Sequence, residues 1–212
     1  MNYFNRLFFL FIVTCCLTVL AQEQKEIKLP APQKEIGKPL MQVLNSRKSI
    51  RTFASTPLPF QEISNILWAA FGINRKDGKR TAPSSRNIQD IDIFVFIPEG
   101  VFLFNAKDNK LVPISPEDLR GMTGTQDYVK SAPLNLVYVS DQSKMGKASS
   151  EDKYITSGAD AGFIAQNVYL YCASQNLGTV IRASVEKKPL GEKLNLKPDQ
   201  IIVLSQTVGF TQ

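Results

Sequence analysis

The 212-residue chain contains no histidine and only three cysteines. Cys15 and Cys16 lie in an apolar N-terminal run, which leaves Cys172 alone in the rest of the sequence. A lone cysteine excludes an intramolecular disulfide there. The absence of histidine excludes the common zinc sites and the Ser-His and Cys-His catalytic pairs, so we expect no metal site. If the protein is an enzyme, we expect a bound cofactor to carry its chemistry.

Strong charge and a glycine-rich nucleotide loop are also missing. The net charge of +6 is modest, and no basic stripe is interleaved with aromatic residues, so we expect no nucleic-acid partner. No G-x-G-x-x-G motif follows a predicted strand, which argues against a Rossmann nucleotide site. A modest positive charge remains compatible with a small ligand that carries a phosphate.

The N-terminus has the pattern of an export signal. Arg6 is followed by an uncharged, mostly apolar run from Leu7 to Ala21, which is short for a spanning helix of about 20 residues. We therefore predict a signal peptide over residues 1–21, export to the periplasm and no permanent membrane span. Ile12 to Cys15 faintly resembles a lipoprotein cleavage box, so lipid anchoring is the second alternative.

We predict a linker over residues 22–35, which are polar and contain proline, and a single domain over residues 36–212. Strands and helices alternate irregularly around a central hairpin, which favours an α+β fold with a helix-covered sheet over a doubly wound parallel sheet. Helices are expected near 40–44, 63–71, 157–177 and 190–194, and another is expected to start at Ser115 to Asp118. Strands are expected at 91–97, 101–104, 110–114, 134–139, 179–181 and 201–208.

Helix 157–177 is predicted to be apolar nearly all round, which is typical of a helix that is deeply buried or part of an interface. Gly178 is expected to end this helix, and Gly209 is expected to close the last strand. Cys172, within the helix, is interpreted as a buried structural thiol.

The segment from Arg47 to Phe53 is the most informative stretch of the chain. It places three cations, Arg47, Lys48 and Arg51, around Ser49. Arginine offers a planar fork of donors that matches phosphate oxygens, lysine adds a point charge, and serine adds a hydroxyl donor. Taken alone, the segment fits either a phosphate site or a basic run on a solvated loop.

Three separated segments form a joint pattern: Arg47 to Phe53, Pro83 to Gln89, and Asp160 through Gln166-Asn167 to Leu177-Gly178-Thr179-Val180. In this order the chain resembles the FMN-dependent nitroreductase family, and within it the shorter SagB-type branch. The hairpin at 100–114, the segment 124–133 and the final Val208-Gly209-Phe210 also match, so the resemblance covers about residues 40–212. Taken alone, residues 83–85 fit an ordinary turn.

The resemblance implies a nitroreductase-like homodimer with a central, mainly antiparallel sheet covered by helices and two FMN sites at the subunit interface. The residues implied to hold the FMN phosphate and ribityl chain are Arg47, Lys48, Ser49 and Arg51. The residues implied to approach the flavin from the partner subunit are Pro83, Ser84, Ser85, Asn87 and, as a further candidate, Gln89. The cofactor-binding set is completed by Leu177 and Gly178, and the backbone groups implied near flavin N5 are those of Ala183 and Ser184.

The chain departs from the family pattern at two places. Many relatives carry an acidic residue and glycine where this chain has Ala183 and Ser184, so only a backbone role carries over; a backbone donor there can stabilise the changing electron density on N5. Many relatives also place a basic residue after the last strand, and this chain has none. We therefore expect FMN to bind more weakly, or to depend more on Arg47 and Arg51.

The resemblance implies an FMN-dependent oxidoreductase that transfers hydride through flavin N5 by a ping-pong mechanism to nitroaromatic, quinone-type or other small acceptors. NAD(P)H is a candidate donor, although it is scarce outside the cytoplasm. One alternative is a SagB-type dehydrogenase that oxidises a peptide-derived heterocycle, since Lys153-Tyr154 matches the Lys-Tyr pair of azoline-oxidising relatives; the other interpretation of this dipeptide is a solvated loop. A further alternative is a non-catalytic protein that binds flavin.

Overall fold

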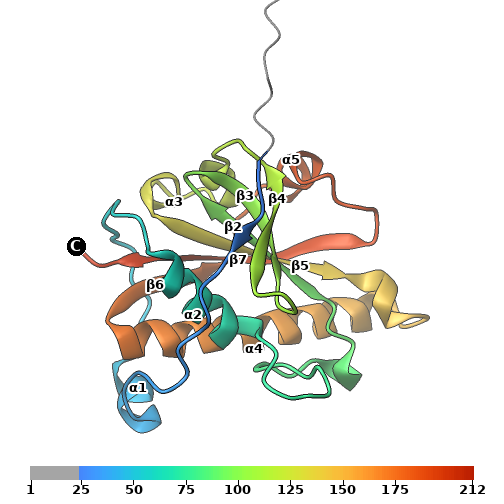
Figure 1. Cartoon of the computed structure of the whole chain (residues 1–212). Helices are drawn as coiled ribbons and strands as arrows, with labels where there is room; N and C mark the ends of the chain where they lie inside the picture. The colour runs from blue at the N-terminus through green and yellow to red at the C-terminus, as the bar shows by residue number, and fades with distance from the viewer. Residues whose placement is uncertain (1–23) are drawn as a thin grey trace, which may run out of the picture.

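The structure is a computed structural model that describes residues 24–212 (Figure 1). Its centre is a seven-stranded sheet of order β1-β4-β3-β2-β5-β7-β6, with every neighbouring pair antiparallel. The strands are β1 (Ile27–Lys28), β2 (Ile91–Ile97), β3 (Gly100–Asn105), β4 (Lys110–Ser115), β5 (Leu134–Asp141), β6 (Leu177–Arg182) and β7 (Gln200–Phe210). The predicted α+β fold with an antiparallel sheet is confirmed, whereas the predicted signal peptide lies outside the described residues.

Helices cover both faces of this sheet. The α-helices are α1 (Leu40–Ser46), α2 (Phe60–Phe71), α3 (Tyr128–Ser131), α4 (Ser150–Gln175) and α5 (Lys187–Lys193), and the 3-10 turns are η1 (Ser85–Asn87), η2 (Arg120–Thr123) and η3 (Gln142–Met145). In Figure 1, α1, α2 and α4 lie on one side of the sheet and α3 and α5 on the other. Among residues 24–212, no helix is both long and apolar enough to cross a bilayer.

The central strand β2 matches its predicted bounds and is apolar on both faces. Its side chains alternate between two cores. Ile93 and Val95 pack in the larger core under α2 and α4, and Phe94 and Phe96 pack in the smaller core that includes Leu190 of α5. Burial on both faces explains why this strand is an apolar run interrupted only by Asp92.

Helix α4 begins earlier and ends earlier than predicted. Ser149 caps its first turn, because its Oγ accepts the N–H of Asp152 at 3.0 Å. Asn176 follows the helix in the left-handed conformation with φ 58°, so Gly178 lies inside β6 instead of ending the helix. Lys153-Tyr154 consequently lies on the first turn of α4, and its interpretation as a loop was wrong.

The segment predicted as a linker is attached to the domain from residue 24 onward. β1 pairs with β4. Ser64 of α2 donates to the carbonyl of Pro30 at 2.6 Å, and Asn65 Oδ1 accepts the N–H of Gln33 at 2.8 Å. A polar, proline-containing composition gave no sign that side chains of α2 would satisfy this backbone.

Two local predictions near turns were also wrong. The helix expected at Ser115 is absent: the Asp118 carboxylate accepts both the N–H and the guanidinium of Arg120, and only the 3-10 turn η2 follows. Such side-chain bonds compete with helix formation. Gly209 does not close β7, which continues to Phe210; a Cβ on Gly209 would lie 2.8 Å from Pro133, so close approach explains the glycine.

Candidate functional site

The basic segment, residues 47–51, runs along the outer strand β6. The N–H of Ile50 donates to the carbonyl of Thr179 at 3.0 Å. Gly178 permits this approach, because a Cβ on it would lie 3.0 Å from Ile50 Cγ2. The glycine therefore sets how closely the basic segment packs on the sheet, and does not act as the helix cap that its position suggested.

Tyr169 of α4 anchors the basic segment from the other side. Its hydroxyl lies 2.8 Å from Ser49 Oγ and accepts the N–H of Ile181 at 3.1 Å. The guanidinium of Arg47 lies 5.2 Å from the centre of the Tyr169 ring, within reach of a cation–π interaction. One buried tyrosine thus joins the segment, α4 and β6.

A cavity of about 550 Å³ opens beside the basic segment. Of the predicted cofactor-binding residues, Lys48 and Leu177 line it, together with residues of α1, α4, β6 and the C-terminus that include Lys38, Asn45 and Thr211. Within residues 24–212, Arg47, Lys48 and Arg51 form no ion pair with a carboxylate. Cations that are free of carboxylates beside a cavity fit an anionic group such as a phosphate.

The second predicted group, residues 83–89, forms a loop against the N-terminal half of α4. Both carboxylate oxygens of Asp160 accept the Ser85 N–H at 3.2 Å, and Ser84 Oγ accepts the N–H of Gln89 at 3.0 Å. The amide of Gln89 is engaged within the loop region, because its Oε1 accepts Arg80 Nε at 2.7 Å. Pro83, Ser85 and Asn87 stay exposed and are available to a ligand or a second subunit.

A pair of carboxyl groups supports this loop. Asp90 is fully buried and accepts Ser140 Oγ at 2.7 Å through Oδ2, and its buried Oδ1 has no hydrogen-bond partner within residues 24–212. Burial and the neighbouring Asp90 carboxyl group raise the pKa of Asp160 to about 7, against a partial opposing effect of the Ser85 N–H. Two neighbouring carboxyl groups disfavour double ionisation, so Asp160 keeps its proton up to about pH 7.

The turn formed by Ala183 and Ser184 follows β6 and is exposed. Among the described residues, neither of its two N–H groups takes part in a backbone hydrogen bond. Gln126, from the stretch between η2 and α3, donates Nε2 to Ser184 Oγ at 2.7 Å. Its Oε1 is buried and has no partner within residues 24–212. The turn therefore presents free donors beside an unsatisfied acceptor, which suits a polar ligand.

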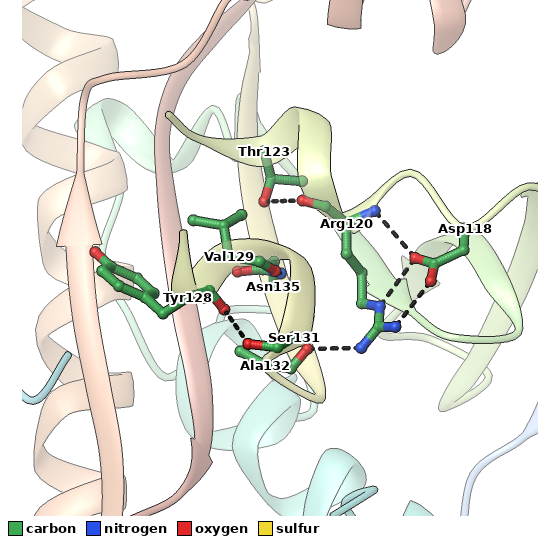
Figure 2. A network of polar contacts seen from close by, with 8 residues as sticks. All are labelled: Asp118, Arg120, Thr123, Tyr128, Val129, Ser131, Ala132 and Asn135. Carbon is green, nitrogen blue, oxygen red and sulfur yellow. Dashed lines mark hydrogen bonds and ion pairs between the residues drawn. The ribbon is translucent and has the colours of Figure 1, made fainter. Parts of the chain in front are cut away.

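Arg182, directly before this turn, is 8% exposed and contacts only neutral oxygens. Nη1 donates to Thr207 Oγ1 at 2.5 Å, and the acceptors of Nη2 are Asn135 Oδ1 and Ser205 Oγ at 3.1 Å and Thr123 O and Oγ1 at 3.2 Å. Burial lowers the pKa of Arg182, although arginine remains protonated. Arg120, by contrast, is bound by Asp118 at 2.9 and 2.8 Å and donates to the carbonyl of Ala132 at 2.8 Å (Figure 2).

Within a single chain, the two groups of predicted site residues, the basic segment and loop 83–89, do not lie together. The basic segment meets α4 at Tyr169 and loop 83–89 meets it at Asp160. At about 1.5 Å of rise per residue, about 14 Å of helix separates these two anchors. The resemblance implied that loop 83–89 acts from the partner subunit, and this separation is compatible with that expectation.

Sequence reasoning missed Tyr169, Gln126 and Arg182. Gln126 had been noted only within a matching segment, and Arg182 reads as an ordinary strand end. A charged residue that follows apolar Val180 and Ile181 in a predicted strand was the one available signal.

A sequence model of the nitroreductase family matches residues 44–210. The chain belongs to this family. A candidate nitroreductase of Methanocaldococcus jannaschii is 28% identical over an alignment of 189 residues that covers 84% of this chain and 94% of that protein. The solved structure of a candidate nitroreductase from Ralstonia eutropha is 40% identical with a TM-score of 0.85, over 91% of this chain and 92% of that chain.

The NADPH:FMN oxidoreductase of Vibrio harveyi, solved with NAD+, is 22% identical with a TM-score of 0.62, over 82% of this chain and 69% of that chain, and shares the fold. As a nitroreductase-family member, the protein is a flavin-dependent oxidoreductase. The predicted family and enzyme class are confirmed, and the non-catalytic alternative is set aside.

Proposed function

We propose that the protein is an FMN-dependent oxidoreductase of the SagB-type branch that works as a homodimer by a ping-pong mechanism. A small hydride donor, with NAD(P)H as the first candidate, and a nitroaromatic, quinone-type or other small acceptor use the same pocket in turn. Bound flavin supplies hydride uptake and release at N5. The residues of the chain bind and orient the flavin and the two substrates.

The basic segment is the observation that carries this proposal. The three cations of the segment have no carboxylate partner within residues 24–212. Lys48 lines the cavity of about 550 Å³ together with Tyr169, which also contacts Arg47 and Ser49. Arg47, Ser49 and Arg51 would hold the FMN phosphate and ribityl chain, with Lys48 as a further donor. Charge-assisted hydrogen bonds to phosphate are strong enough to retain the cofactor without a basic residue after β7.

The proposed homodimer rests on exposed apolar side chains on α1 and α4. They include Leu40 and Met41 of α1, 60% and 76% exposed, and Ile155 and Phe163 of α4, 64% and 48% exposed. Large exposed apolar side chains on two helices of the same side of the sheet fit an interaction surface. A second copy that covered these helices would place loop 83–89 of one protomer near the basic segment of its partner, and the two-fold arrangement would complete two equal sites.

The turn at Ala183 and Ser184 fits the polar part of a flavin. Its two backbone N–H groups are free of backbone partners, and Gln126 Oε1 is a buried acceptor without a donor. We assign the two N–H groups to the N5 side of the ring, where a backbone donor needs no particular side chain.

The test is flavin retention by the mature protein, residues 22–212, after incubation with FMN and desalting. We expect flavin absorbance bands in the wild type and their loss in the Arg47→Ala/Arg51→Ala double variant. Arg75→Ala/Lys76→Ala is the matched control, because it removes two cations from the exposed 74–80 loop. A folded wild type that retains no flavin, or equal retention in both double variants, would contradict the proposed phosphate site.

Oxidation of a peptide-derived heterocycle is the second candidate activity. Tyr154 is 64% exposed on the first turn of α4 and lines a cavity of about 640 Å³ together with residues of α5 and β7. A cavity beside the Lys153-Tyr154 pair offers room for such a substrate. Lys153→Ala separates the two activities: nitroaromatic reduction by the variant should persist, whereas azoline oxidation should collapse if the pair is used.

We also propose a periplasmic location, which rests on the predicted signal peptide. Release of a form that begins near Gln22 by osmotic shock of the producing cells would support it. Retention of the uncleaved chain in the cytoplasmic fraction would contradict it.

A further inference from the structure

Arg182 is a buried cation for which residues 24–212 supply no carboxylate partner. Its contacts are hydroxyl, amide and carbonyl oxygens, and its ring neighbour is Tyr128, 5.8 Å from the guanidinium carbon. Removing a cation from water is costly unless a nearby negative charge compensates it. Neutral oxygens satisfy its hydrogen bonds only in part and leave its charge unbalanced.

The unsatisfied atoms around Arg182 lie together at the predicted flavin side of β6. Arg182 Nε and Gln126 Oε1 are both buried without partners. Both flank Gly124: a Cβ on this glycine would collide with Nε and lie 3.0 Å from Oε1. Gln126 also donates Nε2 to Ser184 Oγ at 2.7 Å. Arg182 thus precedes the turn in the backbone, and Gln126, on the other side of Gly124, hydrogen-bonds to the turn.

We propose that Arg182 is a positioning residue that holds the 183–184 turn and supplies an uncompensated positive charge to the flavin site. The inference rests on the proposed function. Two-electron reduction of FMN with uptake of one proton leaves one negative charge on the ring system, and nearby positive charge favours that form. The protein without flavin supplies no negative charge to balance Arg182, and the reduced cofactor carries such a charge.

Gln126→Glu is the decisive variant, because it adds a carboxylate of nearly equal shape beside Arg182. We expect a higher melting temperature of the apo protein, since the buried cation gains a partner, and a flavin midpoint potential that shifts to more negative values. Arg182→Met should shift the potential in the same direction but lower the apo melting temperature, because it leaves several buried oxygens without a donor. Arg182→Lys should restore the potential toward the wild-type value.

If the role of Arg182 were purely structural, Gln126→Glu would not raise stability and lower the potential at the same time. Arg182→Met should lower both quantities, so the two variants together separate the two roles. Gln61→Glu on α2 makes the same change in net charge away from the site, and Arg120→Met removes an arginine that already has the Asp118 partner. Neither control should shift the potential. The potentials are measured by spectroelectrochemical titration of the flavin-loaded protein.

The order of measurement distinguishes two failures. A wild-type protein that retains no flavin overturns the proposed function and this inference with it. A wild-type protein that retains flavin, with an unchanged potential in Gln126→Glu and in whichever Arg182 variants fold, overturns this inference alone.

Discussion

The N-terminal half of α4 meets loop 83–89 through a pair of carboxyl groups, whereas its C-terminal half meets the basic segment through one tyrosine. At the first end, Asp160 accepts the N–H of Ser85 and lies beside the buried Asp90, which raises its pKa. At the second end, Tyr169 uses a neutral hydroxyl and leaves the cations of the segment free. The phosphate of a cofactor would bind at the second end, where the cations of the basic segment lie. The first end offers backbone groups of loop 83–89.

The largest effect should come from disrupting the proposed dimer, because each flavin site would then lose loop 83–89 of the partner subunit. Phe163 lies between Asp160 and Tyr169 on α4 and is 48% exposed. We expect Phe163→Glu to produce a monomer that retains no flavin, because an interface that buries a new carboxylate loses affinity. Light scattering after size exclusion and the flavin spectrum measure both outcomes.

Phe60→Glu is the matched control for that prediction, because Phe60 is a 40% exposed aromatic residue on α2. It should leave both the dimer and flavin retention intact. A Phe163→Glu protein that remains dimeric and keeps its flavin would place the interface elsewhere on the surface.

The next effect concerns the basic end. Tyr169→Phe removes the acceptor of the Ile181 N–H and the partner of Ser49. We expect a loss of about 0.5–1.5 kcal/mol in the free energy of unfolding, because a partly buried donor loses its hydrogen bond. Urea denaturation measures this loss, and flavin titration should show weaker binding. Tyr154→Phe, at an exposed position of the same helix, should change neither quantity.

The sequence could predict what depends on local pattern. β2 is apolar at every position but Asp92, and its bounds were predicted without error. The basic segment was found because its cations are adjacent in the chain. Tyr169 was missed, and Asp160 was noted only as the start of a matching segment, because their contacts join distant parts of the chain: Tyr169 contacts Ser49 across 120 residues, and Asp160 contacts Ser85 across 75. No local pattern encodes a contact at such separation.

The left-handed conformation of Asn176 explains why the C-terminal end of α4 was predicted wrongly. Glycine is the usual residue after a helix, so Gly178 was the expected stop, but asparagine also tolerates positive φ. β6 starts at Leu177, and its pairing with β7 places Gly178 opposite Gly209. The pairing of β6 with β7, more than helix propensity, therefore sets the C-terminal end of α4.

The acidic end should respond to pH. The pKa of Asp160 is raised to about 7 in the folded protein and is near 4 in the unfolded chain, so the folded state binds the extra proton between these values. Its stabilising contribution is present below about pH 4 and is lost as the pH rises through about 7.

Asp160→Asn should remove this dependence, because an amide side chain does not titrate. We expect the variant to be more stable than the wild type at pH 8, by on the order of 1 kcal/mol, and to show a flatter stability profile between pH 4 and 8. Thermal unfolding across this pH range measures both. Asp127→Asn, at an exposed position, should keep the wild-type slope; an equal slope in the Asp160 variant would show that another group titrates.

The smallest expected effect is the change in stability caused by replacing Gly178, and it tests whether close packing or backbone freedom explains this glycine. Gly178→Ala places a Cβ 3.0 Å from Ile50 and 3.2 Å from Phe53, so the basic segment must shift by a few tenths of an ångström. We expect a loss of about 1 kcal/mol in stability and a modest fall in flavin affinity. Gly191→Ala in α5 meets only an ordinary 3.7 Å contact with Leu196 and should stabilise the protein by about 0.5–1 kcal/mol through helix propensity. Opposite signs in urea denaturation would show that Gly178 is needed to seat the basic segment on β6, whereas equal signs would mean that backbone freedom governs both positions.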